Sequence, residues 1–497
     1  MAKKDLITVV ADPKVPLKEL WSTDDSQVSA ENPFYVPGKG VRNAKTKTGS
    51  DKPFVKINSI PVTEIDMLVI DETGIIPKVK IIFVDGNGAL SGANYPKNDP
   101  IMSVYIKPQN DKFKPIRCDF LITNIITSQD AIMNADSIDT GATFIMTGEL
   151  YVPKIYNNVS KSYRNMNSKD ALKAIASDND LGFACNEFTP NDKMTWLNTN
   201  TSSLRFIEHV SNHSYLDDDT FFTSFIDKFY HLTFVNVAEQ LNPLNEHNMT
   251  YDNMVDSSEL DISQAVTDGK NPDLAEMLSV TGLTNKDNYR GKPEYIINYS
   301  LMGNTGSILK SKGYKKKVFY YDPSLQGAER FTSFFVNPVQ IKGYTGENKG
   351  LEPDDETLRE SIIKKWMNID YGNAHPEWNA SVLINDHNNS ELNKVKLKVE
   401  TAGINFQVNR GQAVPIMMYF PPTTHMEKNM QTKGGNVDGK TETPINIQDL
   451  VPDTIISGKY YVSGVKYIYD RLNPSFPFKT EFQLARVNWL GEKNIVQ

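Results

Sequence analysis

The stretch Lys78-Val79-Lys80-Ile81-Ile82-Phe83-Val84, followed by Asp85-Gly86-Asn87-Gly88, joins a run of β-branched and aromatic residues to a turn sequence. Polar and apolar residues alternate at its start, which is typical of a strand with one face in a core. Asp-Gly and Asn-Gly pairs favour the tight turns that end such strands. The stretch therefore predicts a β-strand followed by a reversal of the chain.

The same pattern recurs on both sides of this strand, between residues 51 and 157. The further strand-like runs are Phe54–Ile57, Met67–Ile70, Ile101–Ile106, Cys118–Ile122 and Ala142–Gly148. Turn residues separate them, as in Pro96–Pro100. Six or more short strands at this spacing predict one compact β-barrel or sandwich.

Residues 158–240 change to helical spacing. Ser168 is expected to cap a first helix, and a second is expected to begin after Thr201 or Ser202. A third helix is predicted from Thr220 to His231, because its apolar residues recur at helical intervals. These residues are Phe221, Phe222, Phe225, Ile226, Phe229 and Tyr230.

Strand patterns return in the C-terminal half, around one expected helix from Asp354 to Met367. The expected strands are Tyr295–Tyr299, Lys317–Tyr321, Phe331–Val336, Ala380–Ile384, Val395–Glu400, Val414–Phe420, Lys459–Tyr469 and Lys479–Val487. The fold class predicted from these patterns is α+β, mainly β, with two β modules and inserted helical and mixed segments.

The chain divides into five expected parts. Residues 1–50 are interrupted by prolines and are interpreted as an extended arm that docks on a neighbour or stays disordered, with a basic DNA-binding arm as the alternative. The others are a β module at 51–157, a helical module at 158–240, a mixed segment at 241–345 that contributes to the second β module, and that module at 346–497 with an exposed loop at 421–449.

Composition excludes several classes of protein. The 53 basic and 61 acidic residues give a net charge of −8, which argues against broad binding of nucleic acid. Two cysteines, Cys118 and Cys185, do not form a disulfide framework, and both are expected to be buried free thiols. No apolar run approaches the roughly 18–20 residues that span a bilayer, so no membrane partner is expected. The N-terminus does not resemble a signal peptide, and we expect assembly in a cytoplasm.

Few residues suggest chemistry. His209 and His213 stand four apart on a predicted helix, a spacing that suits a metal pair, but Val210 replaces the Glu of a metalloprotease helix, so two partly exposed histidines are the preferred interpretation. The acidic run Asp217–Asp219 could hold a cation, but the interpretation we prefer is that it caps the third helix. We therefore predict no catalytic, cofactor-binding or metal residues, and not an enzyme.

Three segments resemble the central hub proteins of contractile phage tails, a T-even-type family related to the hub portion of type VI secretion spike proteins. The first segment is Ile65–Gly74, and the second begins at Asp170–Ala176 and closes with Phe225-Ile226-Asp227-Lys228-Phe229-Tyr230. The third segment, which carries most weight in the resemblance, is Ile456–Val465 with Phe478–Arg486. These motifs are packing patterns and contain no catalytic signature.

The resemblance implies two tube-type β-barrels per subunit and a homotrimer in the tail baseplate of a virion, assembled in the cytoplasm of the host bacterium. Implied partners are the central spike and the tail tube or tube-initiator protein, with the tape-measure protein and inner wedge proteins as further candidates. DNA would pass through a central channel without specific binding. The alternatives are another baseplate or tube-initiator structural protein, or a cell-wall-degrading hydrolase. A trimeric mass without activity on murein would favour the hub.

Overall fold

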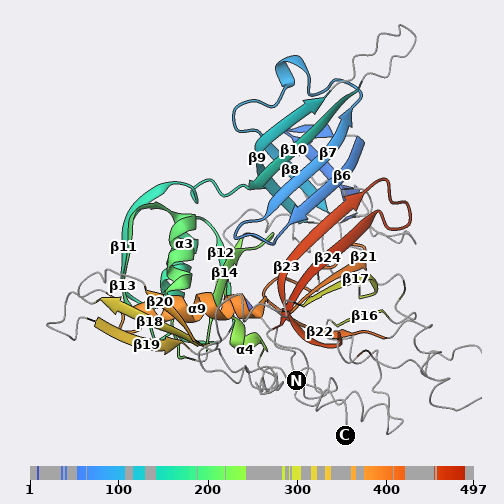
Figure 1. The fold of residues 1–497 in the computed structure, drawn as a ribbon. Helices are drawn as coiled ribbons and strands as arrows, with labels where there is room; N and C mark the ends of the chain where they lie inside the picture. Colours follow the sequence, from blue (N-terminus) through green and yellow to red (C-terminus); the bar gives the residue numbers. More distant parts are fainter. Residues whose placement is uncertain are drawn as a thin grey trace, which may run out of the picture.

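The computed structural model of the chain is mainly β with a smaller share of helix, so the expected α+β class is confirmed (Figure 1). The structure describes residues 8–9, 35–36, 40–41, 53–62, 64–106, 116–128, 141–186, 188–218, 220–241, 282–285, 290, 294–303, 315–321, 331–336, 360–364, 374–393, 395–406, 408–419, 453 and 456–486. Within these ranges, no helix is both long and apolar enough to cross a membrane. The expected loop at 421–449 lies outside them.

The first β module is an antiparallel sheet wrapped around an apolar core. Its elements are β4 (Phe54–Ile57), β5 (Ile60–Val62), β6 (Glu64–Asp71), β7 (Lys78–Asp85), the short 3-10 helix η2 (Gly92–Asn94), β8 (Ile101–Ile106), β9 (Ile116–Ser128) and β10 (Ala142–Leu150). The strand order is β6-β7-β10-β9-β8-β4-β5. Ile81, Phe83 and Met146 are buried, and the Phe83 and Phe144 rings stack with centroids 5.2 Å apart. The strands expected here are confirmed.

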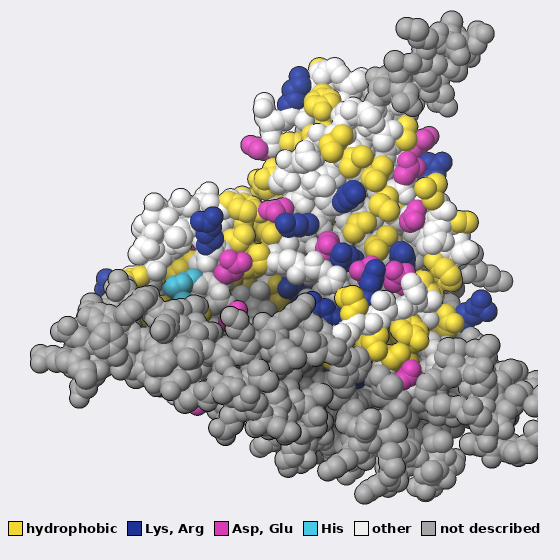
Figure 2. All heavy atoms as spheres, viewed as in Figure 1, with side chains coloured by type: hydrophobic (Ala, Val, Ile, Leu, Met, Phe, Trp, Pro, Cys, Tyr) yellow, Lys and Arg dark blue, Asp and Glu magenta, His cyan; other side chains and the backbone are white. Residues whose placement is uncertain are grey.

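The outer face of this sheet also carries apolar side chains. The strand register places Met67 opposite Ile82, Ile82 opposite Ile145, and Ile145 opposite Ile126 on four neighbouring strands. Ile126 is 52% exposed. Hydrophobic side chains gather on the face of this module seen in Figure 2, between charged ones. Apolar residues on both faces are the pattern expected of a sheet that contacts another surface.

The middle segment, residues 151–241, combines helices with strands. Its elements are β11 (Asn158–Met166), α2 (Ser168–Asp178), β12 (Gly182–Cys185), β13 (Met194–Ser202), α3 (Ser203–Asn212), β14 (Phe222–Ile226), β15 (His231–Asn236) and α4 (Val237–Leu241). One sheet has the order β1-β12-β15-β14, in which β1 is Thr8–Val9 from the N-terminal arm. Strands β11 and β13 pair as a separate ribbon.

The first two of the three helices predicted in this segment are present. The side chain of Ser202 accepts a hydrogen bond from the N–H of Arg205 and caps α3, which begins at Ser203, the second of the two predicted starts. Helix α2 begins at Ser168, but its cap is Asn167, whose Oδ1 accepts from the N–H of Asp170 at 2.8 Å. The prediction that Ser168 is the cap is therefore wrong by one residue.

The third predicted helix, from Thr220 to His231, is wrong. Strands β14 and β15 form a hairpin there. Oδ1 of Asp227 accepts hydrogen bonds from the N–H groups of Phe229 and His231, both at 2.9 Å, and Tyr230 has a φ of 61°. Bonds from a side chain to the nearby backbone compete with helix formation, and here they fix a tight turn.

The second β module continues the sheet of the first. Its strands are β16 (Leu283–Thr284), β17 (Ile296–Gly303), β21 (Val395–Ala402), β22 (Ala413–Met417), β23 (Gly458–Asp470) and β24 (Phe478–Arg486). The order β17-β21-β24-β23 leads directly into β6, from the pair Lys466–Asp71 to the pair Asp470–Met67. Barrel closure is not detected in the strand pairs of the described residues. β5 and β17 end the main path of this sheet, while β22 and β16 branch from β23, and Thr284 of β16 bridges Tyr295 beside β17.

The seam between β6 and β23 is closely packed. Gly464 lies at a bulge in β23. A Cβ at this position would lie 2.7 Å from Cγ2 of Thr73, which is shorter than side chains tolerate. Glycine is therefore required there for the two modules to approach each other.

Two further predictions in the C-terminal half are wrong. Ala380–Ile384, expected as a strand, lies in helix α9 (Trp378–Leu392), because a short apolar run does not distinguish a buried strand from a helix. The expected helix Asp354–Met367 contains strand β20. The remaining strands are β20 (Glu360–Lys364), β18 (Lys315–Tyr321) and β19 (Phe331–Val336), which form one sheet, and β2 (Tyr35–Val36) with β3 (Gly40–Val41).

Candidate functional site

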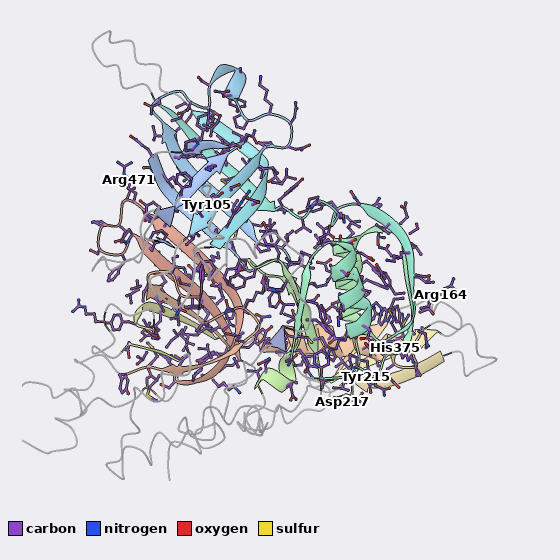
Figure 3. The ribbon with its side chains drawn as sticks, turned by 180° about the vertical axis from the view of Figure 1, so that it is seen from behind. Tyr105, Arg164, Tyr215, Asp217, His375 and Arg471 are labelled. Carbon is purple, nitrogen blue, oxygen red and sulfur yellow. The ribbon has the colours of Figure 1, made fainter. Side chains whose placement is uncertain are left out.

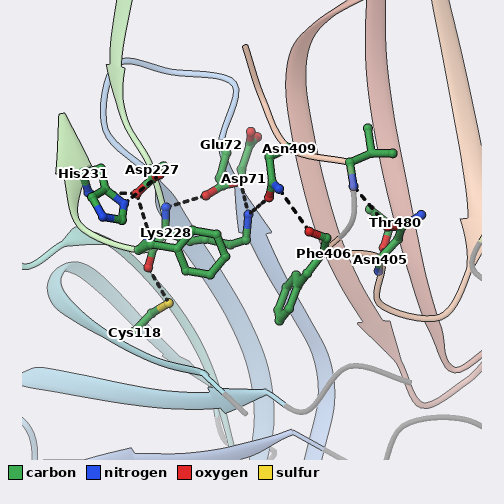
Figure 4. A network of polar contacts seen from close by, with 12 residues as sticks. Asp71, Glu72, Cys118, Asp227, Lys228, His231, Asn405, Phe406, Asn409 and Thr480 are labelled. Carbon is green, nitrogen blue, oxygen red and sulfur yellow. Dashed lines mark hydrogen bonds and ion pairs between the residues drawn. The ribbon is translucent and has the colours of Figure 1, made fainter. Parts of the chain in front are cut away.

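A buried ion pair lies where the two β modules and the middle segment meet (Figure 4). Nζ of Lys228, in the turn between β14 and β15, lies 3.4 Å from Oε2 of Glu72, at the end of β6. It donates to Oδ1 of Asn409, which follows β21, at 2.8 Å. The Lys228 and Glu72 side chains are only 1% and 2% exposed. We call Glu72, Cys118, Asp227, Lys228 and Asn409 the Lys228 junction.

Several groups around the ammonium group of Lys228 stabilise its buried charge. Its Nζ lies 4.3, 5.3 and 5.1 Å from the ring centroids of Phe229, Phe406 and Tyr467. The N–H of the same lysine donates to Oε1 of Glu72 at 2.6 Å. A buried charge is costly unless it is paired and hydrogen-bonded, so these contacts are what makes a lysine tolerable at this position.

A second charged pair stabilises the turn that carries Lys228. Oδ2 of Asp227 lies 3.3 Å from Nδ1 of His231. Burial alone would raise the pKa of Asp227, but the charge and hydrogen bonds of His231 outweigh it, and the pKa is lowered. For His231, burial acts to lower the pKa, and Asp227 raises it above its ordinary value. Each group therefore favours the charged form of the other.

Burial also acts on the pKa of two further groups of the junction, Glu72 and Cys118. Burial raises the pKa of Glu72, although Lys228 opposes this effect. Burial also raises the pKa of the Cys118 thiol, which donates to the carbonyl oxygen of Lys228 at 3.5 Å. Cys118 and Cys185 are both free and buried, as predicted. A thiol with a raised pKa is a poor nucleophile, so Cys118 serves packing.

The loop after β6 is bonded to both other parts of the chain. The N–H of Ile226 donates to the carbonyl of Ile75 at 2.8 Å. Arg410 donates to the carbonyl of Gly74, and its guanidinium carbon lies 4.2 Å from the ring centroid of Phe225. The three parts of the chain are thus joined by directional bonds around one loop.

A second cluster lies where α9 meets α3. The rings of His213 and Trp378 stack with centroids 3.7 Å apart, and the ring of His209 lies 4.4 Å from His213. The ring centroid of Trp378 lies 5.7 Å from that of His375 and 5.8 Å from that of Trp196. We call these five residues the His–Trp cluster. Its contacts are between aromatic rings, stacked for His213 with Trp378 and tilted or edge-on for the others, so packing and not charge holds α9 in place.

Two histidines of this cluster use a ring nitrogen to bond to the backbone. Nδ1 of His213 donates to the carbonyl of His209 at 2.8 Å, and Nε2 of His375 donates to the carbonyl of His213 at 2.9 Å. Among the described residues, no group of three or more metal-ligating side chains could hold an ion. Burial lowers the pKa of both His209 and His375, which keeps their rings neutral.

Asp217 and Asp218 do not cap a helix, because strand β14 follows them, and Asp219 lies outside the described residues. The N–H of Asp217 bonds to Oγ1 of Thr220 at 3.3 Å, and Asp218 accepts from the hydroxyl of Tyr215 at 3.0 Å. The ring of Tyr215 lies 6.4 Å from that of His375, and Figure 3 labels both residues. Asp217 and Asp218 therefore take part in the bonds of the loop that precedes β14, and the interpretation that the acidic run caps a third helix is wrong because no helix follows.

Sequence reasoning found the histidine pair but missed the Lys228 junction. Nothing about an isolated lysine in a sequence indicates that it is buried, and its partners, Glu72 and Asn409, are 156 and 181 residues away. The one available signal was that Lys228 falls inside a segment of family resemblance. That segment had been assigned to a helix.

The described residues thus define a mainly β chain whose two β modules share one sheet and are joined at a buried polar centre. No family model matches the chain, and no curated protein matches its sequence. Its structure is similar to that of the 43 kDa tail protein of prophage MuSo2 from Shewanella oneidensis, with 8% identity, a TM-score of 0.46, and 88% of this chain and 98% of that chain covered.

Two further structures are similar to this chain. A tail protein from Neisseria meningitidis MC58 has 10% identity and a TM-score of 0.42, with 87% of this chain and 96% of that chain covered. An E. coli component of the type VI secretion system, described as similar to T4 bacteriophage tail proteins, has 8% identity and a TM-score of 0.38, with 87% and 77% covered.

Proposed function

We propose that the chain is the structural hub of a contractile phage-type tail baseplate. In this proposal it forms a homotrimer that joins the tail tube to the central spike and leaves a channel for DNA. The protein acts by holding surfaces in fixed positions and catalyses no reaction.

The main support for the proposal is that the three segments of family resemblance meet at one place in the structure. Ile65–Gly74 supplies β6 and Glu72, Phe225–Tyr230 supplies Lys228, and the C-terminal segment supplies β23. Strand β23 pairs with β6, and the N–H of Glu72 donates to the carbonyl of Val465 at 2.8 Å. Residues that resemble a hub family in the sequence are thus those that fix the two β modules to each other.

A fixed orientation between two β modules is what a ring-forming adaptor requires. If each subunit contributes two modules, three subunits place six modules around an axis, which matches a sixfold tube above and a threefold spike below. Movement between the two modules would disturb the match to the sixfold tube and the threefold spike. A buried ion pair where the modules meet opposes such movement.

The proposed partners follow from that position. The spike would lie below the ring and the tail tube or tube-initiator protein above it, with the tape-measure and inner wedge proteins as further contacts. The net charge of −8 suits a channel that repels DNA phosphates. The division into arm, first β module, middle segment, mixed segment and second β module is part of the same proposal, as is a location in the virion tail after assembly in the host cytoplasm.

The test is the mass of the purified chain, by native mass spectrometry and light scattering. We expect three times the 56.0 kDa of one chain, and ring-shaped particles with a central opening in electron micrographs. A species that stays monomeric at all concentrations would contradict the trimer. Release of soluble fragments from purified murein would contradict the non-enzymatic role.

A further inference from the structure

Helix α9 covers the edge of β14 where a further strand would pair. Among the described strands β14 pairs with β15 alone, and the other side of an edge strand carries unpaired backbone groups unless something covers it. The N–H of Phe222 donates to Oδ1 of Asn385 at 2.8 Å, and Nδ2 of Asn389 donates to the carbonyl of Phe222 at 3.0 Å. Two side-chain amides one helical turn apart thus take the place of a partner strand. Figure 1 shows α9 beside α3 and β14.

Asn385 also joins α9 to the end of α3. Its Nδ2 donates to the carbonyl of Asn212, the last residue of α3, at 3.0 Å, and to the carbonyl of Ser214 at 2.9 Å. Asn385 is buried, so these backbone groups would need water or another partner if α9 moved away. The bonds of this one amide therefore form or break together with the docking of the helix.

Helix α9 has little stability of its own. Four of its 15 residues are asparagine, and Val382 and Ile384 are β-branched. Both kinds of residue have low helix propensity. Its first turn has no acidic residue and its last turn no basic one, so no charge there favours the helix dipole. Such a helix depends on tertiary contacts, and those around its first residue, Trp378, are the His–Trp cluster.

His375 is the member of this cluster at which a second proton costs most. The residue is 3% exposed, and its Nε2 donates to the carbonyl of His213, so the neutral ring carries its proton on Nε2. Nδ1 is buried without a hydrogen-bond partner among the described residues. A proton on Nδ1 would add a buried charge and a donor that lacks an acceptor. His209, by contrast, is exposed to solvent.

The described charged groups around the cluster do not compensate for a charge on His375. Burial lowers its pKa, and the bond to the carbonyl of His213 opposes this effect only in part. The charged side chains on the described elements that pack here are Arg205 and Glu208 of α3, Asp217 and Asp218 before β14, Glu377 before α9, and Asp386 within it. Three of them raise the pKa of Tyr215, but none of the six changes the pKa of His375.

We infer that α9 is an acid-sensitive cover, and that protonation of His375 releases the helix and exposes the backbone of Phe222 at the edge of β14. Because the pKa of His375 lies below 6.5 in the docked state, docking is favoured above pH 6.5 and is lost as the pH falls through the lowered value. No residue of α9 belongs to the Lys228 junction, so the two β modules stay joined. The release takes place within one subunit and does not depend on the self-association in the proposed function.

The test is amide hydrogen exchange of the full chain at pH 7.5 and pH 5, with each rate divided by the intrinsic rate of that amide at the same pH. We expect the amides of α9 and of Phe222 to lose at least tenfold in protection at pH 5, while β6 and β23 keep theirs. His375→Gln keeps a donor for the carbonyl of His213 but cannot take up the proton, so its α9 should be equally protected at both pH values. His209→Gln is the matched control and should retain most of the acid response, because that ring is exposed.

A second pair of variants tests the cover itself. Asn385→Ala removes the acceptor for the N–H of Phe222 and should expose this amide at both pH values. Asn393→Ala removes an exposed amide that donates to the carbonyl of Asn389 at 2.7 Å, and should leave Phe222 protected. A wild-type α9 with the same protection at both pH values, or an acid response that persists in His375→Gln, would overturn the release. A Phe222 amide that stays protected in Asn385→Ala would show that α9 does not cover the edge.

Discussion

The Lys228 junction and the His–Trp cluster both join segments that are far apart in the sequence, but they do so by different physical means. The junction uses a buried charge with directional bonds to Glu72 and Asn409. The cluster packs aromatic rings around Trp378, and Nδ1 of His375 is buried without a hydrogen-bond partner among the described residues. A charge pair fails when one partner is lost, whereas ring packing loses stability in proportion to the contact removed. The junction should therefore be the more rigid of the two contacts.

The largest effect expected is at the ion pair. Lys228→Met leaves the Glu72 carboxylate buried and removes the bond to Asn409. Breaking one side of a buried pair costs about 3–5 kcal/mol. Chemical unfolding followed by fluorescence and circular dichroism would measure this loss in the free energy of unfolding.

Two controls separate the ion pair from the loss of a long side chain. Lys161→Met breaks an ion pair with Asp178 whose side chains are 44% and 39% exposed, and it should cost at most about 1 kcal/mol. The double variant Glu72→Gln with Lys228→Met removes both charges and should recover part of the loss. If Lys228→Met cost no more than Lys161→Met, the junction would not be a rigid centre.

The next effect is at the His–Trp cluster. Trp378→Ala removes the ring that stacks on His213, and we expect a loss of about 2–3 kcal/mol, at or below the low end for buried aromatic residues because Trp378 is only partly buried. The loss should be local, with faster amide exchange in α9 and little change in β6 and β23. Trp378→Phe keeps part of the stack and should cost clearly less. A uniform increase in exchange across both modules would show that the cluster and the junction are not distinct.

A smaller loss of stability is expected from a change at Gly464, where β23 packs against the end of β6. Gly464→Ala forces a Cβ toward Cγ2 of Thr73, and overpacking of this kind costs about 1–3 kcal/mol. Gly86→Ala is the matched control, because a Cβ there meets nothing within 4 Å. Equal unfolding midpoints for the two variants would mean that the modules can separate at this seam without cost.

The parts of the fold that sequence reasoning predicted are those with local signals. Alternation identified β7 and β10, and the Ser202 cap identified the start of α3. The strands of the C-terminal hairpin were also expected. In each case the residues that decide the structure lie within a few positions of one another, so a single sequence contains the signal.

The parts that it missed depend on distant partners. Six apolar residues between Phe221 and Tyr230 suit a helix and a hairpin equally, and the side chain of Asp227 decides between them. The pairing of β6 with β23 joins residues about 400 positions apart. Neither the burial of Lys228 nor its charge partner is visible before that pairing is known, so the main site emerged only from the structure.

The smallest effect expected is a difference in the pH dependence of the two regions. The pKa of His231 is raised above its ordinary 6.5, so its contribution to stability is present below pH 6.5 and is lost as the pH rises through the raised value. The pKa of His375 is lowered below 6.5, so its contribution is present above pH 6.5 and is lost as the pH falls. The two regions should therefore respond to pH with opposite signs.

The measurement is the free energy of unfolding of His231→Gln and His375→Gln between pH 5.5 and 8, against the wild type at each pH. The deficit of His231→Gln should be largest at pH 5.5 and shrink toward pH 8, because the variant lacks a stabilising charge that the wild type holds only when protonated. The difference for His375→Gln should run the other way, since glutamine cannot take up the proton that destabilises the folded wild type in acid. Parallel curves for the two variants would show that the electrostatic distinction between the junction and the cluster is wrong, even if the larger mutational effects are found.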